Sequence, residues 1–414
     1  MIADKTWRTR SVILDAGMSP KYLHALTRGR TGLVLDPALG GQRDRLLAGD
    51  LRGAPILELP AGPVDTERVR EVTAFVLAKG LRTVVGLGGG SVMDAVKLGA
   101  LFSADPSLAV YVERHARRSG LMVVPAMAAP HERPRTVLMP STIGTGAEVS
   151  AVACLDTAVG RRLLASRHLA ADAAVLDAAH LADLPRHLLL EGLLEAFLRV
   201  AGTVAGSSAS IFDDDAHLLL CRIVALGQRL TQEDSPGLRL SAARLSQETH
   251  TGWSLAGRDP YGAKHWYVAN ELAYHAGIRK MSATAAIIPA IWEEITRGAA
   301  AWGDARRLAA LWSAVTGTDS SLPPNPALGI AELMRRWGLN QPTVVAHGTA
   351  QEAASSSIRN WGGVLPMLRG LTAAQVLQVL QPGEDPAGVD PAGGGQRAAS
   401  NLPHATTPTA RERR

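Results

Sequence analysis

The chain has 414 residues, of which 46% are hydrophobic and 20% charged, as expected of a soluble globular protein. Its net charge of +5 is small for this length and forms no basic stripe, so we expect no nucleic-acid partner. Cys154 and Cys221 are the only cysteines, which excludes a disulfide scaffold and a cysteine-rich zinc site. The polar start MIADKTWRTR and the lack of a long apolar run predict a cytoplasmic protein without a membrane partner.

The first part of the chain alternates short apolar runs with helical patterns. Strands are predicted at residues 32–36, 55–59, 83–87, 136–140 and 174–177. Helical spacing is found at residues 66–79, which stop at Gly80, and at residues 91–102. This alternation predicts a parallel, doubly wound sheet.

From about Pro185 the pattern changes to long helical runs with few strand signals. At this length two domains are the default expectation. We therefore predict an α/β domain over residues 1–180 and an all-α domain over residues 181–381. Residues 382–414 are rich in Gly, Pro, Ala and Thr without a periodic apolar face, which predicts a disordered tail.

Two glycine-containing loops follow predicted strands. Residues 86–97, GLGGGSVMDAVK, open a helix, and glycines there let the backbone approach a pyrophosphate while N–H groups face the anion. A tight turn with a capping box is the alternative interpretation of this loop alone. Residues 140–149, PSTIGTGAEV, supply hydroxyls and further glycines after another strand, which favours a phosphate or nicotinamide site.

Together, GGGSxxDxxK and PSTxGTGxE resemble the iron-containing alcohol dehydrogenase and dehydroquinate synthase-like superfamily, over about residues 20–380. The resemblance implies a Rossmann-like N-terminal domain, a helical C-terminal domain and a cleft between them for a nicotinamide cofactor. It assigns cofactor binding to Gly88, Gly89, Gly90, Ser91, Asp94, Ser141, Thr142, Thr145 and Arg162. Asp36 ends the first predicted strand, where an acidic side chain binds ribose hydroxyls, so NAD is expected rather than NADP.

The metal site of this family is altered here. Dehydrogenases of the family bind Fe²⁺ or Zn²⁺ through one Asp and three His, and the matching positions hold Glu195, Arg199, Asn270 and Lys280. Arginine and lysine normally stay protonated and do not ligate cations. We therefore predict that the metal is absent. A partial site rebuilt from Glu195 with His265 or His275 is the alternative.

Arg199 and Lys280 place positive charge where the family has a metal, which favours a substrate with a carboxylate or phosphate group. The alternative is that Arg199 merely pairs with Glu195 while Lys280 is solvated. Tyr274, His275 and His265 are, with Lys280, candidates for proton transfer.

The leading hypothesis is a metal-independent, NAD-dependent oxidoreductase of specialised metabolism that acts on an alcohol of an anionic small molecule or peptide. Family members in daptide-type pathways are thought to decarboxylate a C-terminal threonine oxidatively, which is a named alternative. A non-redox cyclase similar to dehydroquinate synthase and a cofactor-binding pseudoenzyme are the others. A homo-oligomer is compatible with each of these hypotheses.

Overall fold

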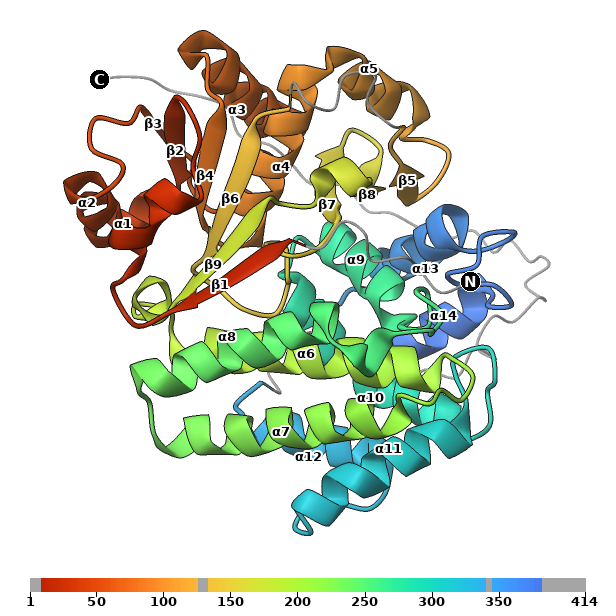
Figure 1. Cartoon of the computed structure of the whole chain (residues 1–414). Coiled ribbons are helices and arrows are strands. Elements are labelled where there is room, and N and C mark those ends of the chain that lie inside the picture. Colours follow the sequence, from red (N-terminus) through yellow and green to blue (C-terminus); the bar gives the residue numbers. More distant parts are fainter. Residues whose placement is uncertain (1–8, 126–132, 340–344, 382–414) are drawn as a thin grey trace, which may run out of the picture. The chain divides into compact units, whose positions relative to one another are not determined.

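The first part of the chain forms a parallel, six-stranded sheet (Figure 1). The computed structural model describes residues 9–125, 133–339 and 345–381. The strand order is β1-β9-β6-β4-β2-β3, and neighbouring strands of this sheet are parallel. The strands are β1 (Arg10–Leu14), β2 (Thr31–Leu35), β3 (Ile56–Glu58), β4 (Thr83–Gly88), β6 (Arg135–Pro140) and β9 (Ala173–Asp177). The five predicted strands and the parallel sheet are thus confirmed, whereas β1 was not predicted.

Helices cover both faces of this sheet because successive side chains of a strand point to opposite faces. Val34 packs in a cluster with residues of α3 and α4, whereas Leu33 and Leu35 pack in a second cluster with residues of α2. The helices of this part are α1 (Ser19–Tyr22), α2 (Gly40–Ala48), α3 (Thr66–Lys79), α4 (Gly90–Ala104) and α5 (Pro106–His115). Asp65 caps α3 and Gly80 ends it in a left-handed conformation, as the sequence predicts.

A second, smaller sheet was not predicted. It consists of β5 (Leu121–Val123), β8 (Gly160–Ala165) and β7 (Val152–Thr157), with β7 and β8 paired as an antiparallel hairpin. The apolar and polar residues of its strands do not alternate regularly in the sequence, so the sequence gives little signal for them. The hairpin packs against α4 and forms one wall of the site described below.

The second part is helical and packs around α6 (Arg186–Ala205), most of whose side chains are buried. In Figure 1 the long helices α6, α7 (Asp213–Gln232) and α8 (Pro236–Thr251) lie side by side. The remaining helices are α9 (His265–Ala276), α10 (Lys280–Thr296), α11 (Ala305–Thr318), α12 (Pro326–Arg336), α13 (His347–Trp361) and α14 (Ala373–Leu380). The all-α character predicted after Pro185 is confirmed.

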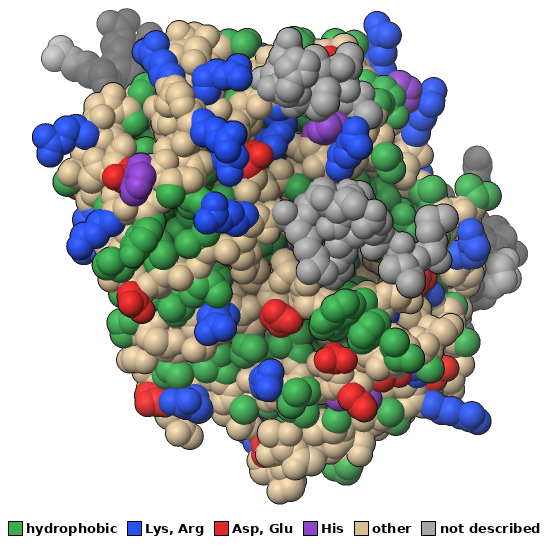
Figure 2. Space-filling view, in the orientation of Figure 1, with side chains coloured by type: hydrophobic (Ala, Val, Ile, Leu, Met, Phe, Trp, Pro, Cys, Tyr) green, Lys and Arg blue, Asp and Glu red, His purple; other side chains and the backbone are tan. Residues whose placement is uncertain are grey.

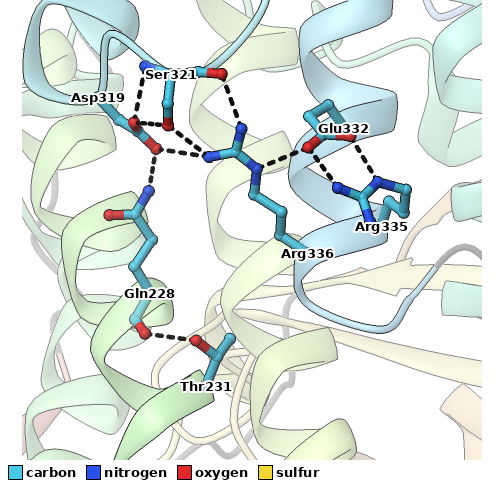
Figure 3. Close-up of polar contacts among 7 residues, drawn as sticks. All are labelled: Gln228, Thr231, Asp319, Ser321, Glu332, Arg335 and Arg336. Carbon is cyan, nitrogen blue, oxygen red and sulfur yellow. Dashed lines mark hydrogen bonds and ion pairs between the residues drawn. The ribbon is translucent and has the colours of Figure 1, made fainter.

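A network of ion pairs and hydrogen bonds joins α7 to α12 and to the turn after α11 (Figure 3). Arg336 on α12 pairs with Asp319, which follows α11, and with Glu332 one turn earlier on its own helix. Asp319 also accepts a hydrogen bond from Gln228 on α7. These polar contacts therefore connect α7, the turn after α11, and α12.

The described residues up to Gln381 belong to one compact unit. Strands give way to helices between Asp177 and Arg186, but a division into domains at residue 180 stays a prediction. The predicted tail, residues 382–414, lies outside the described residues. On the face shown in Figure 2, basic side chains are spread among uncharged and acidic ones. Among the described residues no single helix is long and apolar enough to cross a bilayer, although the bent pair α4 and α5 has the length and composition together.

Candidate active site

The two glycine-containing loops lie side by side at the carboxyl edge of the sheet. β4 and β6 are neighbours in register from Thr83 and Arg135 to Gly88 and Pro140, and Ser141 N donates to Gly88 O at 2.9 Å. Helix α4 begins at Gly90 without a side-chain cap, so its first N–H groups remain available to an anion. A Cβ at Gly90 would lie 3.1 Å from the Thr145 side chain. Glycine therefore keeps open the space between the loops that a pyrophosphate needs.

The Asp and Lys of the first motif anchor the second loop. Lys97 is 1% exposed, and its Nζ donates to Ala147 O at 2.9 Å and to Val152 O. It also pairs with Asp94 at 3.1 Å, and the second carboxylate oxygen of Asp94 accepts from Cys154 N at 2.9 Å. Asp94 and Lys97 therefore hold the loop and the hairpin β7–β8 against α4.

A cavity of about 1240 Å³ opens beside these loops. Of the predicted cofactor residues, Gly90, Ser91, Asp94 and Thr145 line it. Four others, Gly88, Gly89, Ser141 and Thr142, lie in the same loops but outside the cavity lining. Asp36 also lies outside the lining, at the carboxyl end of β2, where its N–H bonds to Leu87 O of β4 at 3.1 Å. These residues fit a dinucleotide, because an uncapped helix start, glycines without Cβ and an acidic strand end occur at one edge.

Arg162 does not reach the cavity. It is 2% exposed, and its guanidinium donates to the carbonyl groups of Ala116, Val159 and Arg161, so its role is structural. Its neighbour Arg161 lines the cavity instead and forms a bidentate pair with Asp156. Arg161 and not Arg162 therefore faces the cavity, because adjacent residues of a strand point to opposite faces.

Four charged and aromatic side chains meet in the cavity beside the second loop, where Arg199 donates to Gly144 O. Glu195 and Arg199 are one turn apart on α6, and Lys280 is the first residue of α10. Glu195 Oε1 lies 3.4 Å from Lys280 Nζ and 3.8 Å from the Arg199 guanidinium. Two cations therefore share one carboxylate, which leaves the cluster with a net positive charge.

Trp266 on α9 completes this cluster and was not predicted. Lys280 Nζ lies 3.9 Å from the centroid of the Trp266 ring, and the Arg199 guanidinium carbon lies 5.9 Å from it. The π face of tryptophan attracts both cations and holds them near each other. Arg199 is fixed further by hydrogen bonds to Thr249 Oγ1 and Gly144 O, although burial lowers its pKa. A tryptophan beside a histidine in the sequence carries no signal that would reveal this role.

Asn270 lies one turn after Trp266 on α9 and also lines the cavity. It is 7% exposed, and its Oδ1 has no hydrogen-bond partner among the described residues. A buried amide without a partner costs free energy unless a ligand meets it. Asn270 is therefore available to a bound molecule.

These residues do not suit a divalent cation. Such an ion needs three or four nitrogen, oxygen or sulfur donors, but Glu195 is already paired with two cations. In the part of the chain that the structure describes, no group of three His, Cys, Asp or Glu side chains is placed to bind a metal. His265 is not among the residues that line the cavity, so it does not provide a second metal donor beside Glu195.

The remaining proton-transfer candidates lie away from the cavity lining. His265 is 3% exposed, and burial lowers its pKa to about 3, which keeps the imidazole neutral. Tyr274 is 37% exposed, and His275 bonds to Ser356 Oγ of α13 at 2.8 Å. The geometry supports none of these three as catalytic residues. His250 on α8, which was not predicted, is the histidine that lines the cavity among the described residues; burial lowers its pKa well below the usual value.

The fold and the sequence motifs agree with known proteins. Residues 25–178 match the family model of iron-containing alcohol dehydrogenase. Escherichia coli K-12 YqhD superposes with a TM-score of 0.74 at 18% identity, covering 90% of this chain and 96% of that one. The NADH-dependent butanol dehydrogenase A of Thermotoga maritima has a TM-score of 0.67 at 18% identity and also covers 90% of this chain. The chain therefore resembles the iron-containing alcohol dehydrogenases in sequence over residues 25–178 and in fold over most of its length.

Two sequence relatives of this alcohol dehydrogenase-like chain have names that specify anionic aldehydes. The sulfoacetaldehyde reductase of Bilophila wadsworthia is 27% identical over 48% of this chain and 50% of that protein. The phosphonoacetaldehyde reductase of Streptomyces viridochromogenes is 31% identical over 51% of this chain and 60% of that protein. The chain spans about half the length of the curated relatives it matches. The predicted alcohol dehydrogenase-like class agrees with the family model and these relatives.

Proposed function

We propose that the protein is a NAD-dependent oxidoreductase that interconverts an alcohol and a carbonyl on a substrate with an anionic group. We further propose that it works without a metal ion. The observation that carries this proposal is the cluster of Arg199 and Lys280 around Glu195, at the positions where the resemblance places metal ligands. The fold and the two reductases of anionic aldehydes support it.

The first step of the argument concerns the position of Lys280. A lysine as the first residue of a helix opposes the helix dipole, which favours negative charge at that end. Glu195 offsets this cost only partly, because it also faces Arg199. Arg279, at the N-cap of α10, provides no side-chain cap, so α10 also presents its first N–H groups. Lysine, arginine and free N–H groups together favour an anion at this end of the cavity.

The second step concerns the chemistry. Bound nicotinamide supplies or accepts the hydride. Lys280 stabilises negative charge on the substrate oxygen and donates a proton to it when a carbonyl is reduced. Arg199 is already bonded to Thr249 and Gly144, so it orients an anionic group with little loss of its own freedom. The amide of Asn270 bonds to a substrate hydroxyl or carbonyl.

Asp36 supports the choice of NAD over NADP. It is half-buried at the end of β2, next to the strand that leads into the glycine loop. A carboxylate there bonds ribose hydroxyls and repels a 2′-phosphate. Replacing Asp36 with glycine should therefore weaken NADH binding and reduce the discrimination against NADPH.

The test compares sulfoacetaldehyde and phosphonoacetaldehyde with acetaldehyde and propanal, with NADH absorbance as the readout. We expect kcat/KM to be at least about tenfold higher for the anionic aldehydes, since one charge-assisted pair contributes roughly 1.5–3 kcal/mol. Equal values for charged and neutral aldehydes would refute the anionic substrate. Loss of turnover on chelation, restored by Zn²⁺ or Fe²⁺, would refute metal independence.

The other hypotheses have distinct outcomes in the same experiments. Release of CO₂ from a β-hydroxy acid or a threonine-ended peptide would identify an oxidative decarboxylase. NADH binding without turnover of any substrate would identify a pseudoenzyme. A cyclase similar to dehydroquinate synthase is disfavoured, because Arg199, Asn270 and Lys280 stand where the resemblance places metal-binding histidines.

A further inference from the structure

The proposed chemistry does not use Trp253, a part of the cavity wall that is backed by Phe212. Trp253 lines the cavity and is 59% exposed. Its ring stacks on Phe212, with centroids 5.0 Å apart and planes 20° apart. Leu255, Pro260 and Tyr267 also line the cavity, so the wall around Trp253 is mostly apolar.

The pair is held in place by a buried arginine. Arg258 is 8% exposed, and its Nε donates to Ser254 O at 2.7 Å, in the turn that carries Trp253. Its Nη2 donates to Phe212 O at 3.2 Å, and its Nη1 pairs with Asp213 at 2.7 Å. One guanidinium therefore ties the backbone of Phe212 to the turn that carries Trp253. An incidental exposed tryptophan would not need this support.

The extent of the cavity also bears on the substrate. Its volume of about 1240 Å³ includes the space beside Gly90, Ser91, Asp94 and Thr145 that the proposed dinucleotide would fill. Its lining continues along α6 from Arg199 to Thr203 and includes the segment 253–260. A two-carbon anionic aldehyde would leave the apolar wall in contact with water.

We propose that Trp253 and Phe212 form a subsite for an apolar or aromatic body of the substrate, whose anionic head binds at Arg199 and Lys280. The position of the head rests on the proposed function, whereas the subsite rests on the aromatic pair. The substrate is therefore an amphipathic hydroxy or oxo acid that is larger than the aldehydes named for the two sequence relatives. Burial of the Trp253 face by this body supplies binding free energy that a small acid lacks.

The test uses 3-hydroxybutyrate, 3-hydroxyoctanoate and 3-hydroxy-3-phenylpropionate, which share one head and differ in the group on the reacting carbon. We expect kcat/KM to increase with the apolar body. Trp253→Ala should lower kcat/KM for the phenyl acid by about tenfold and for 3-hydroxybutyrate by less than about twofold. Trp253→Phe should keep most of the preference. Leu328→Ala is the matched control, because Leu328 is 63% exposed and does not line the cavity.

Binding measurements separate the two proposals. Calorimetry of the NAD-loaded protein compares 3-phenylpropionate with propionate, neither of which carries the reacting hydroxyl. A preference for the phenyl acid that Trp253→Ala removes supports the subsite even where no hydroxy acid is oxidised. Oxidation of all three hydroxy acids with equal kcat/KM overturns the subsite and leaves the proposed function intact. Failure of both carboxylates to bind overturns the subsite and the anionic head.

Discussion

Replacing Glu195 with glutamine tests the charge arrangement directly, because the side-chain volume stays while the charge is lost. Glu195 is 5% exposed and lies 3.4 Å from Lys280 Nζ and 3.8 Å from the Arg199 guanidinium. Removing one partner of a buried ion pair costs about 3–5 kcal/mol. We expect the lower end, about 3 kcal/mol, because the Lys280 side chain is 31% exposed and is partly stabilised by water.

Differential scanning calorimetry measures this loss. In large domains 1 kcal/mol shifts Tm by about 2 °C, so Glu195→Gln should lower Tm by about 6 °C. Glu191→Gln is the matched control on the same helix. Glu191 pairs with Arg279 at 2.6 Å, but the Arg279 side chain is 56% exposed, so its loss should cost less than about 1 kcal/mol.

Sulfate provides the second part of this prediction. The two cations left by Glu195→Gln form a stronger anion site, so sulfate should raise Tm more in the variant than in the wild type. Equal Tm values for wild type and Glu195→Gln would show that the pairing of this carboxylate with Arg199 and Lys280 does not stabilise the fold. Equal sulfate effects would show that the cations are not accessible to an anion.

Three further predictions use other groups. Lys280→Met should abolish turnover while the Kd for NADH, measured by fluorescence, stays within about twofold of the wild-type value. Unchanged turnover would show that Lys280 takes no part in catalysis. Equimolar Zn²⁺ should not raise Tm, because the site offers no set of neutral or anionic donors; a shift of more than about 2 °C would contradict this. Burial lowers the pKa of His180 to about 4 from 6.5, so the unfolded state binds a proton that the folded state does not. Stability should therefore fall by about 3 kcal/mol as pH decreases from 6.5 to 4, and His180→Asn should reduce this slope in pH-dependent unfolding experiments.

The two glycine-containing loops at the carboxyl edge of the sheet were predictable, because the sequence patterns that indicate them are local. A run of apolar residues followed by glycines identifies β4, the loop and the start of α4 without knowledge of any distant contact. The motif spacing then places the second loop, and adjacent parallel strands bring the two loops together. Glu195 and Lys280 were found by resemblance, and the structure brings them within 3.4 Å of each other.

The residues that were missed depend on tertiary packing. Arg161 replaces Arg162 because the register of an unpredicted hairpin decides which of two adjacent arginines faces the cavity. Trp266 and His250 lie near the cations only because α8 packs against α6 and α9 packs against α10, and no periodicity shows this. Tyr274 follows Asn270 by four residues on α9, yet Asn270 lines the cavity and Tyr274 does not.

At the four positions where the resemblance places metal ligands, the residues of this chain give the same net charge as the family's metal site would. A divalent ion with one aspartate and three neutral histidines carries a net charge of +1, and so do Arg199, Lys280, Glu195 and neutral Asn270 together. A single replacement should therefore disturb the site, whereas Glu195→Gln combined with Lys280→Met restores the net charge of +1.

We expect this double variant to recover most of the stability lost in Glu195→Gln, because the cation left unpaired by that change is removed with it. It should not recover turnover, because Arg199 cannot donate a proton to the substrate oxygen. Additive losses of stability in the double variant, measured by calorimetry, would show that the two side chains do not balance each other.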